Sequence, residues 1–280
     1  MKFSNRILFI SALFFVLNWE LSGQKGPIAI IGAMPEEVQA MLAEMPRKRE
    51  KAIEGIRFYK GKMSGQKVVL VEAGIGKVNA AMSTTLLLLK FHPKAVLFTG
   101  VAGGLDESMQ PGDIILAERT CQHDYGRWLE EGYVPRPTRN PQNRQDNPAY
   151  FPADPTLLSL AQQTAPALTL TTVPGTQHQP QITTGTVATG DLFVASPEKA
   201  AQIRAHWQAN AVEMEGAAVA QICHQQGVPH LIIRSISDRA DHQARVSFDQ
   251  FKIAAAQNAA ALVSALVKAI ARQKPAAKRP

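Results

Sequence analysis

A repeated pattern, in which an apolar run reaches a glycine and is followed by a helix-like segment, constrains the fold of this chain most. The first copy is the run Ile28–Ala33, which leads into a helical pattern over Pro35–Glu44 with proline in its first turn. In the second copy, Val68–Val71 leads through Gly74-Ile75-Gly76 into a helical stretch over Lys77–Phe91. Continuous apolar strands that alternate with helices predict an α/β fold with a mostly parallel sheet covered on both faces.

The pattern continues towards the C-terminus. A third apolar run, Ala95–Phe98, ends in the small-residue segment Thr99–Gly104. Two interpretations of this segment are equally consistent with the sequence: a closely packed turn, or a backbone that a ligand can approach. The other predicted elements are strands at Asp113–Ala117, Gln181–Ala188, Ala211–Met214 and His230–Ser235, and helices at Pro197–Trp207, Gly216–Gln226 and Phe248–Arg272. Between Asp124 and Pro155 many prolines interrupt the pattern, which predicts a long loop that is functional or disordered.

Length and composition favour one domain. The 280 residues, with 45% hydrophobic content, can bury one large core, and no repeat or flexible linker divides the chain. We therefore expect a single domain over residues 24–272, with a proline-rich insertion at about 127–155, followed by a basic tail at 273–280.

The first residues differ in kind from the rest. Two basic residues precede an apolar stretch from Ile7 to Leu17, which is too short to span a bilayer and is typical of an export signal. We expect a signal peptide over residues 1–23 that is removed, and an exported, periplasmic protein with no stable membrane association afterwards. Cutting after Gly23 would leave Leu21 where a small residue is preferred, so an uncleaved membrane anchor is the alternative.

Charge and cysteine content exclude several classes of function. The net charge is +7, and much of the excess lies in the C-terminal tail, where no aromatic side chains are interleaved with the basic ones as in a base-stacking surface. We therefore expect no nucleic-acid partner. The chain contains only Cys121 and Cys223, which excludes a disulfide framework and a multi-cysteine zinc site.

Acidic residues follow three of the predicted strands. Glu36-Glu37 comes after the first strand, Glu213-Met214-Glu215 ends a later one, and Asp238 follows the strand that carries Arg234. Carboxylates at the carboxyl ends of parallel strands lie where an open α/β sheet binds its ligand. The two later glutamates would share a face if their strand continued through both. Their alternative is an exposed strand end, and the alternative for Asp238 is a helix cap.

The glycine-rich turn before the second helix resembles a phosphate loop only superficially. In Gly74-Ile75-Gly76-Lys77, the next residue is Val78, where a phosphate loop needs Ser or Thr. A tight strand-to-helix turn explains this segment better.

Six motifs occur in the order found in 5′-methylthioadenosine/S-adenosylhomocysteine nucleosidases, and the chain resembles that family from about Ile28 to Lys268. The motifs are Gly32-Ala33-Met34-x-Glu36-Glu37, Gly74-Ile75-Gly76-Lys77-Val78, Thr99-Gly100-Val101-Ala102-Gly103-Gly104, Thr189-Gly190-Asp191-x-Phe193, Val212-Glu213-Met214-Glu215 and Arg234-x-Ile236-Ser237-Asp238. The resemblance implies a three-layer α/β/α nucleoside phosphorylase-like fold with a mixed, mostly parallel central sheet. It also implies a homodimer that hydrolyses the N-glycosidic bond of an adenine nucleoside without metal or cofactor.

The resemblance implies a role for each matched residue. Asp238 would be the general acid that protonates adenine N7, Glu37 would orient and deprotonate water, and Glu215 would hold the ribose hydroxyls. An acid and a base on opposite sides of the bond is the arrangement of inverting glycoside hydrolysis, and it requires two carboxyl groups in different protonation states. The residues that would contact the substrate are Met34, Ile75, Val101, Phe193, Val194, Glu213, Met214, Arg234, Ser237 and Phe248, with Phe193 stacked on adenine, Val194 supplying backbone contacts, and Met34, Ile75, Met214 and Phe248 beside the ribose and the alkylthio group.

Three departures leave the preferred 5′ group open. Pro35 replaces an acidic residue that is common in the family, Val101 lacks the hydroxyl that some relatives carry, and the segment Arg127–Pro155 is longer and different. The alternatives are an aminodeoxyfutalosine nucleosidase, a purine nucleoside phosphorylase and a non-catalytic exported purine-nucleoside binder. A carboxylate at Glu37 would repel phosphate, which favours water as the nucleophile.

Overall fold

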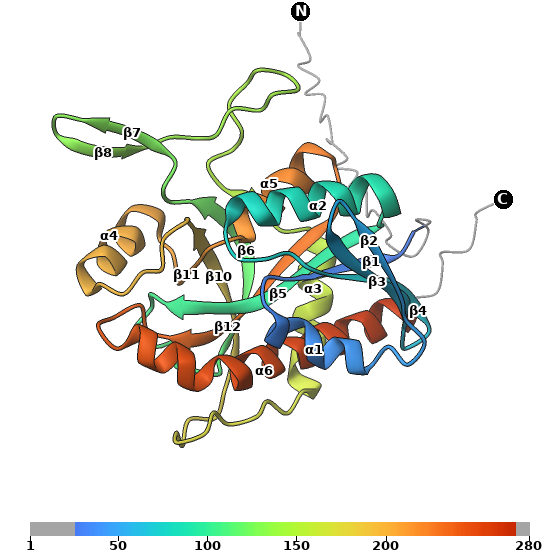
Figure 1. Cartoon of the computed structure of the whole chain (residues 1–280). Helices are drawn as coiled ribbons and strands as arrows, with labels where there is room; N and C mark the ends of the chain where they lie inside the picture. Colours follow the sequence, from blue (N-terminus) through green and yellow to red (C-terminus); the bar gives the residue numbers. More distant parts are fainter. Residues whose placement is uncertain (1–25, 273–280) are drawn as a thin grey trace, which may run out of the picture.

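The computed structural model describes residues 26–272, which form a mixed β-sheet with helices on both faces (Figure 1). The predicted signal peptide at 1–23 and the basic tail at 273–280 lie outside the described residues. The strands are β1 (Ile28–Gly32), β2 (Arg49–Ile53), β3 (Ile56–Met63), β4 (Gln66–Glu72), β5 (Ala95–Gly104), β6 (Ile114–Gln122), β7 (Gly126–Leu129), β8 (Gly132–Pro135), β9 (Phe151–Pro152), β10 (Ile182–Thr189), β11 (Ala211–Glu213) and β12 (His230–Asp238). The helices are α1 (Pro35–Ala43), α2 (Lys77–Phe91), α3 (Pro155–Thr164), the 3-10 turn η1 (Ala165–Ala167), α4 (Pro197–Trp207), α5 (Gly216–Gln225) and α6 (Ala244–Arg272).

The main sheet has the strand order β11-β10-β6-β12-β5-β1-β4-β3-β2, with β9 paired to β6. β1 pairs in parallel with β4 and β5, and β12 pairs in parallel with β5, whereas β6–β12 and the edge β4–β3–β2 are antiparallel. The sheet is mixed, as the sequence predicts. Because β11 pairs both with β10 and with β5, the strands β5, β12, β6, β10 and β11 form a closed circuit, whereas the sequence suggested an open sheet.

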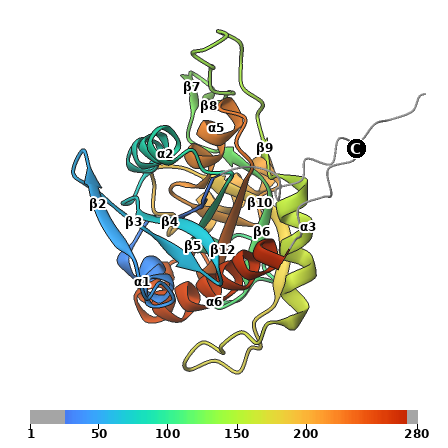
Figure 2. The same cartoon turned by 90° about the vertical axis from the view of Figure 1, so that its right-hand side faces the viewer.

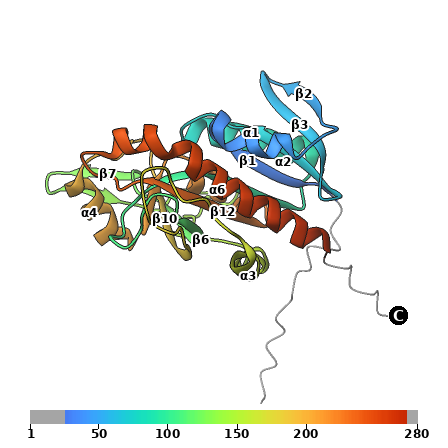
Figure 3. The ribbon, with the colours of Figure 1, turned by 90° about the horizontal axis from the view of Figure 1, so that it is seen from below.

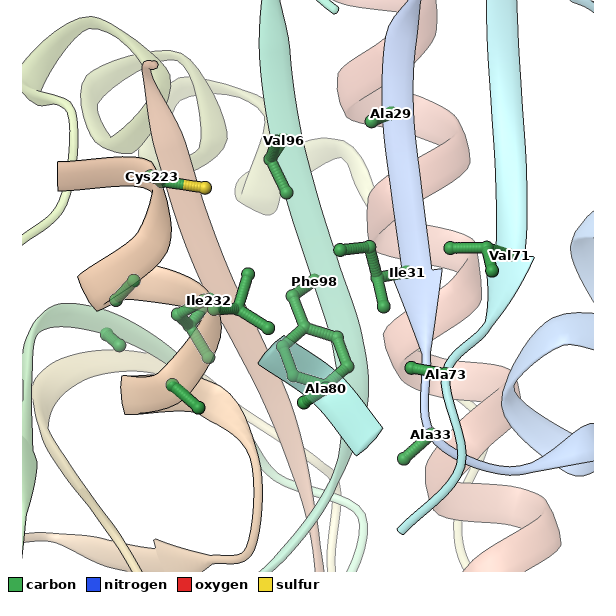
Figure 4. Close-up of a cluster of buried hydrophobic side chains, with 14 of the residues drawn as sticks. Ala29, Ile31, Ala33, Val71, Ala73, Ala80, Val96, Phe98, Cys223 and Ile232 are labelled. Carbon is green, nitrogen blue, oxygen red and sulfur yellow. The ribbon is translucent and has the colours of Figure 1, made fainter. Parts of the chain in front are cut away.

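Side chains alternate across the sheet, and each set is covered by its own helices (Figure 2). Ala29 and Ile31 of β1 lie in a cluster with residues of α2 and α5, which Figure 4 shows together with Phe98 and Ile232. Ile28 and Ile30 lie in a second cluster with residues of α1, α3 and α6. This alternation produces the three α/β/α layers that the sequence predicts.

Helix α6 is the one helix among the described residues that is long and apolar enough to cross a membrane. Its most apolar window is 61% buried inside the fold, and Leu262, Val263 and Leu266 pack against the sheet. Its composition therefore fits a core helix of the α/β/α fold.

The predicted strands and helices are present with shifted ends, but several elements were not predicted. The predicted strand at Asp113–Ala117 starts at Ile114 and runs to Gln122, and the last helix starts at Ala244 instead of Phe248. The edge strand β2, its neighbour β3 and the helix α3 were missed. The proline-rich segment is not wholly irregular, because it contains the hairpin β7–β8, which projects from the sheet in Figure 1, and the short strand β9.

Candidate active site

A cavity of about 290 Å³ lies at the carboxyl ends of β1, β5, β11 and β12. Its lining consists of Ala33, Met34, Glu37, Ile75, Val101, Ala102, Gly103, Phe193, Val212, Glu213, Met214, Glu215, Ser237, Asp238 and Phe248. Every site residue predicted from the sequence lies in this lining except Val194 and Arg234. Val194 lines a small adjoining recess that shares Phe193 and Asp238 with the cavity, and Arg234 is buried behind the wall.

Glu37 lies in the first turn of α1 and is buried. Its Oε2 accepts hydrogen bonds from the backbone amides of Ala33 (2.5 Å) and Met34 (2.9 Å), and its Oε1 accepts one from Val101 of β5 (3.2 Å). Burial raises the pKa of Glu37 above the usual carboxyl value, and the charge of Arg234 and these three amides oppose that shift. All three amides are donors, so they stabilise the carboxylate form and fix its position.

Asp238 reaches the cavity because β12 contains an irregularity. Ile236 pairs with Ala102 of β5 and Asp238 pairs with the very next residue, Gly103, so Ser237 is the extra residue of a β-bulge. Asp238 Oδ1 accepts a hydrogen bond from the amide of Ala240 (2.9 Å), and Oδ2 accepts one from the hydroxyl of Ser237 (2.8 Å). Burial raises the pKa of Asp238, which these two hydrogen bonds oppose.

Two glycines of β5 make room for these carboxyl groups. A Cβ atom added to Gly100 would lie 2.8 Å from Glu37 Oε1, and one added to Gly103 would lie 2.8 Å from Asp238 Oδ1. The small-residue run Thr99–Gly104 is therefore a surface that side chains approach closely, which was one of its two sequence interpretations. Both carboxyl groups therefore lie close against β5, each beside one of its glycines.

Glu213 forms a buried ion pair with Arg234. Arg234 donates from Nη2 (2.7 Å) and Nε (3.2 Å) to Glu213 Oε2, and its guanidinium lies 4.0 Å from the ring centroid of Phe98. Glu213 also accepts hydrogen bonds from the hydroxyl of Thr189 and from the first amides of α5. Although Glu213 lines the cavity, its carboxylate is engaged by the protein, so its geometry indicates a supporting position.

Glu215 is more available to a ligand. The strand ends at Glu213, and Glu215 is the N-cap residue of α5, so the condition under which both glutamates would share one face of a strand is not met. Glu215 Oε1 accepts one hydrogen bond, from the amide of Gly76 at 2.7 Å. Burial, and then the charge of Glu213, raise the pKa of Glu215 to about 8. The carboxyl group is thus largely protonated at neutral pH and has oxygen positions left for other partners.

The rest of the cavity wall is apolar. The rings of Phe193 and Phe248 meet edge to face with centroids 5.7 Å apart, and Met34 packs beside Phe248 against Val101. Phe193 is 47% exposed and Ile75 is 53% exposed, so both lie at the rim of the cavity. Aromatic and thioether side chains around a few carboxyl groups suit a ligand with a planar ring and a polar sugar.

A polar network that was not assigned from the sequence joins three loops around the site. Lys77 Nζ contacts Asp124 Oδ1 at 2.5 Å, the amide of Lys77 donates to Asp191 Oδ1 at 2.7 Å, and the amide of Asp191 donates to Asp124 Oδ2 at 2.7 Å. The signals in the sequence were the positions of Lys77 and Asp191 within two of the matched motifs. Gly76, next to Lys77, has a φ of 96°, which confirms the predicted tight turn.

Comparison with known proteins identifies the class. The model of the phosphorylase superfamily matches residues 27–268, so the chain belongs to that superfamily. A 5′-methylthioadenosine/S-adenosylhomocysteine nucleosidase of Bacillus thuringiensis subsp. konkukian (strain 97-27) is 41% identical over 228 residues, which cover 80% of this chain and 90% of the relative. Within the superfamily, the chain therefore belongs to the 5′-methylthioadenosine/S-adenosylhomocysteine nucleosidases.

Solved structures show the same relationship. The 5′-methylthioadenosine/S-adenosylhomocysteine nucleosidase from Neisseria meningitidis, in complex with methylthio-immucillin-A, matches with a TM-score of 0.75 and 35% identity. The match covers 87% of this chain and 99% of that one. A futalosine hydrolase of Helicobacter pylori strain 26695 matches with a TM-score of 0.74 and 32% identity over 86% of this chain and 97% of that one. Both structures share the fold of this chain.

Proposed function

We propose that this protein hydrolyses the N-glycosidic bond of 5′-methylthioadenosine, S-adenosylhomocysteine or a related 5′-substituted adenosine and releases adenine. The observation that carries the proposal is that Glu37 of α1 and Asp238 of β12 line one cavity, and that each contacts β5 there. An acid and a base on opposite sides of the scissile bond, with a water between them and the sugar, is the arrangement of inverting glycosidases. The family to which the chain belongs supports this reaction.

Asp238 acts as the general acid in this proposal. Adenine is a poor leaving group as an anion, so a proton must reach its N7 as the bond to the sugar breaks. The raised pKa of Asp238 favours a protonated carboxyl group in the buried site. The bulge at Ser237 directs the carboxyl into the cavity, where it can donate to the base.

Glu37 acts as the base that activates water. Its carboxylate accepts hydrogen bonds from three backbone amides, whereas the carboxyl group of Asp238 accepts two hydrogen bonds. Because each donor stabilises the charged form, we assign the ionised state to Glu37. Glu37 takes a proton from water as the oxygen attacks the anomeric carbon, and its charge stabilises the positive charge that develops on the sugar. Proton exchange with solvent then restores both carboxyl groups.

The other residues position the substrate. We assign the ribose hydroxyls to Glu215, whose oxygens are not all engaged, and adenine to Phe193 with the backbone of Val194. Met34, Ile75, Met214 and Phe248 form the apolar wall beside the ribose and the 5′ group. Val101 contributes its backbone to the placement of Glu37.

The cavity favours water over phosphate as the nucleophile. The carboxylate of Glu37 lines it at the position proposed for the attacking water, and none of the described lining residues is a lysine or an arginine. The guanidinium of Arg234 is occupied by Glu213 and by the carbonyl oxygens of Phe98 and Ile233. A phosphate dianion would therefore meet repulsion without a compensating cation.

Hydrolysis of an aminodeoxyfutalosine-type nucleoside is the second candidate. The similarity to the futalosine hydrolase of Helicobacter pylori supports it, because that protein matches over nearly the same share of the chain as the nucleosidases. The two reactions differ in the 5′ substituent. Comparison of kcat/KM for methylthioadenosine and aminodeoxyfutalosine separates them.

We also propose a homodimer and export to the periplasm. Val78, Met82 and Leu89 are exposed on one face of α2, and such an apolar stripe fits an interface with a second copy. Export rests on the sequence of the first residues. N-terminal sequencing of the protein recovered from a periplasmic fraction tests it, and an intact Met1 on protein found only in the cytoplasm would refute it.

Chromatographic detection of free adenine tests the reaction. Purified protein should release adenine from methylthioadenosine in phosphate-free buffer, at a rate that added phosphate does not increase. A strict requirement for phosphate would assign the chain to the phosphorylases instead. Tight binding of the nucleoside without release of adenine would favour a non-catalytic binder.

A further inference from the structure

A second cavity, of about 780 Å³, lies at the end of the sheet opposite the nucleoside site and is strongly basic. We name it the basic groove; it is lined by Gly26, Pro27, Pro46, Arg47, Arg49, Lys60, Gly61, Lys62, Lys67, Val68, Lys90 and Phe91. Six of these residues are cationic and none is acidic. The groove lies where β1 and β4 begin and α2 ends, whereas the nucleoside site lies where the strands end.

The cations are opposed directly across the strands. Arg49 of β2 pairs with Lys60 of β3, and Lys62 of β3 pairs with Lys67 of β4. Like charges directly opposite each other in an antiparallel sheet are destabilising. Two such pairs in adjacent rows therefore lower the stability of this edge unless an anion lies between them.

The protein itself does not neutralise these charges. Within residues 26–272 none of the six cations forms an ion pair, and all six are exposed. Lysines on an edge strand can simply prevent sheet-to-sheet aggregation. That role explains Arg49 on the edge strand β2, but it does not explain Lys67 on the interior strand β4 or Lys90 at the end of α2.

Both ends of the described chain lie beside this groove. Gly26 is part of the lining, and Figures 1 and 3 show that β1 begins and α6 ends at the same end of the molecule as β2, β3 and β4. The sequence before Gly26 contains basic residues and the apolar stretch from Ile7 to Leu17, and the sequence after Arg272 is rich in lysine and arginine. The described chain therefore begins and ends at the same end of the molecule as the basic groove.

We propose that the basic groove binds the phosphate head groups of anionic phospholipids, so that this end of the protein docks on a membrane surface and the nucleoside cavity faces away from it. Basic pockets are established receptors for anionic head groups, and each lysine or arginine near such a surface adds to the attraction. A nucleic acid fits less well, because Phe91 is the only aromatic residue among those lining the groove. The association is reversible and weakened by salt, in contrast to anchoring by an apolar segment.

Vesicle sedimentation tests this proposal with the full chain as purified, its N-terminus defined by intact mass. Wild-type protein should bind vesicles that contain phosphatidylglycerol more tightly than pure phosphatidylcholine vesicles, and salt should reduce the difference. The variant Lys60→Gln, Lys62→Gln, Lys67→Gln should bind the anionic vesicles about 100-fold more weakly. The matched control Arg127→Gln, Arg136→Gln, Arg144→Gln removes equal charge from exposed positions of the insertion and should bind like wild type.

A second measurement separates loss of binding from loss of folding. Because the lysine variant removes repulsion between Lys62 and Lys67, it should melt no lower than wild type and keep full nucleosidase activity. Equal binding of the lysine variant and wild type to anionic vesicles would overturn the proposal, and so would equal binding of wild type to both vesicle types. Tighter binding to a short single-stranded RNA, lost in the same variant, would assign the groove to nucleic acid instead.

Discussion

Arg234 and Glu213 form an ion pair that is almost completely inaccessible to solvent, with side-chain exposures of 1% and 2%. The pair joins β12, which carries Asp238, to β11, which leads into Glu215. The positive charge of Arg234 also lowers the pKa values of Glu37 and Glu215, against the effect of burial. One guanidinium therefore supports the geometry and the ionisation of the whole site.

Replacement of Arg234 should destabilise the protein strongly. Arg234→Met leaves the carboxylate of Glu213 buried without its partner, which costs about 3–5 kcal/mol. Urea denaturation measures this loss in the free energy of unfolding. The control is Lys252→Met, which removes a partly exposed cation 3.8 Å from Glu36 and should change stability by less than about 1 kcal/mol. Equal effects of the two substitutions would contradict the supporting role.

Asp238→Asn should abolish most activity while the fold remains. The amide oxygen of asparagine can still accept from the backbone of Ala240, but the side chain cannot donate an acidic proton to adenine. We expect kcat to fall by roughly 10²–10⁴, the range typical of general acid catalysis. Asp241→Asn changes a nearby carboxylate outside the cavity and should lower the rate less than about tenfold. Wild-type turnover by the Asp238 variant would remove this residue from the mechanism.

Adjacent glycines of β5 give a steric test of the acid's position. The new Cβ of Gly103→Ala would lie 2.8 Å from Asp238 Oδ1, whereas that of Gly104→Ala would meet its nearest neighbour at 3.4 Å. Displacement of the acid by about 1 Å can cost on the order of 100-fold in rate. Steady-state kinetics should therefore show a large loss of kcat for the first variant and little change for the second. Similar activities would mean that Asp238 tolerates displacement.

Glu215→Gln should alter how stability depends on pH. The pKa of Glu215 is about 8 in the folded protein and 4.5 in the unfolded chain. Between about pH 4.5 and pH 8, the folded protein therefore keeps this proton, whereas the unfolded chain loses it. The unfolded state then binds fewer protons, so this group lowers stability as pH rises. Glutamine does not titrate. The variant should match wild type near pH 4 and exceed it near pH 8 by about 1 kcal/mol or more, roughly 2–4 °C in Tm. A constant Tm difference between the proteins across that range would refute the shifted pKa.

The exposed face of α2 gives a test of the proposed dimer. Leu89→Glu places a charge within the apolar stripe formed with Val78 and Met82, so light scattering should show a shift from dimer to monomer. Ile253→Glu, which changes an exposed residue of α6, should leave the mass unchanged. A monomeric wild-type protein would exclude the dimer directly.

The core strands and the carboxyl groups at the strand ends could be predicted from short-range patterns, whereas the apolar site residues, such as Phe193 and Phe248, were expected only from the family resemblance. Continuous runs such as Ile28–Ala33 identify buried strands, and carboxylates at the ends of such strands meet at one edge of the sheet. Strand β3, which pairs with β2 and β4, was missed because several charges interrupt its apolar residues. Helix α3 lies next to the proline-rich segment, whose irregular pattern concealed the N-cap Asp154.

Other features depend on contacts between distant segments, which no local pattern contains. The bulge at Ser237 is defined only by the register of β12 against β5. The engagement of Glu213 by Thr189 and Arg234, and the availability of Glu215, depend on where β11 stops and α5 begins. Similarly, the link between Asp124 and Asp191 joins loops after two different strands.

The two carboxyl groups that we propose to react, those of Glu37 and Asp238, both lie against β5, which separates the proposed chemistry from selectivity. Helix α6 supplies Phe248, and the loop after β4 supplies Ile75, so side chains proposed to meet the variable 5′ group come from segments other than β5. Mutations in those segments can reshape the pocket for a new 5′ group while bond cleavage stays intact. This scaffold is therefore well suited to evolving new substrate preferences one side chain at a time.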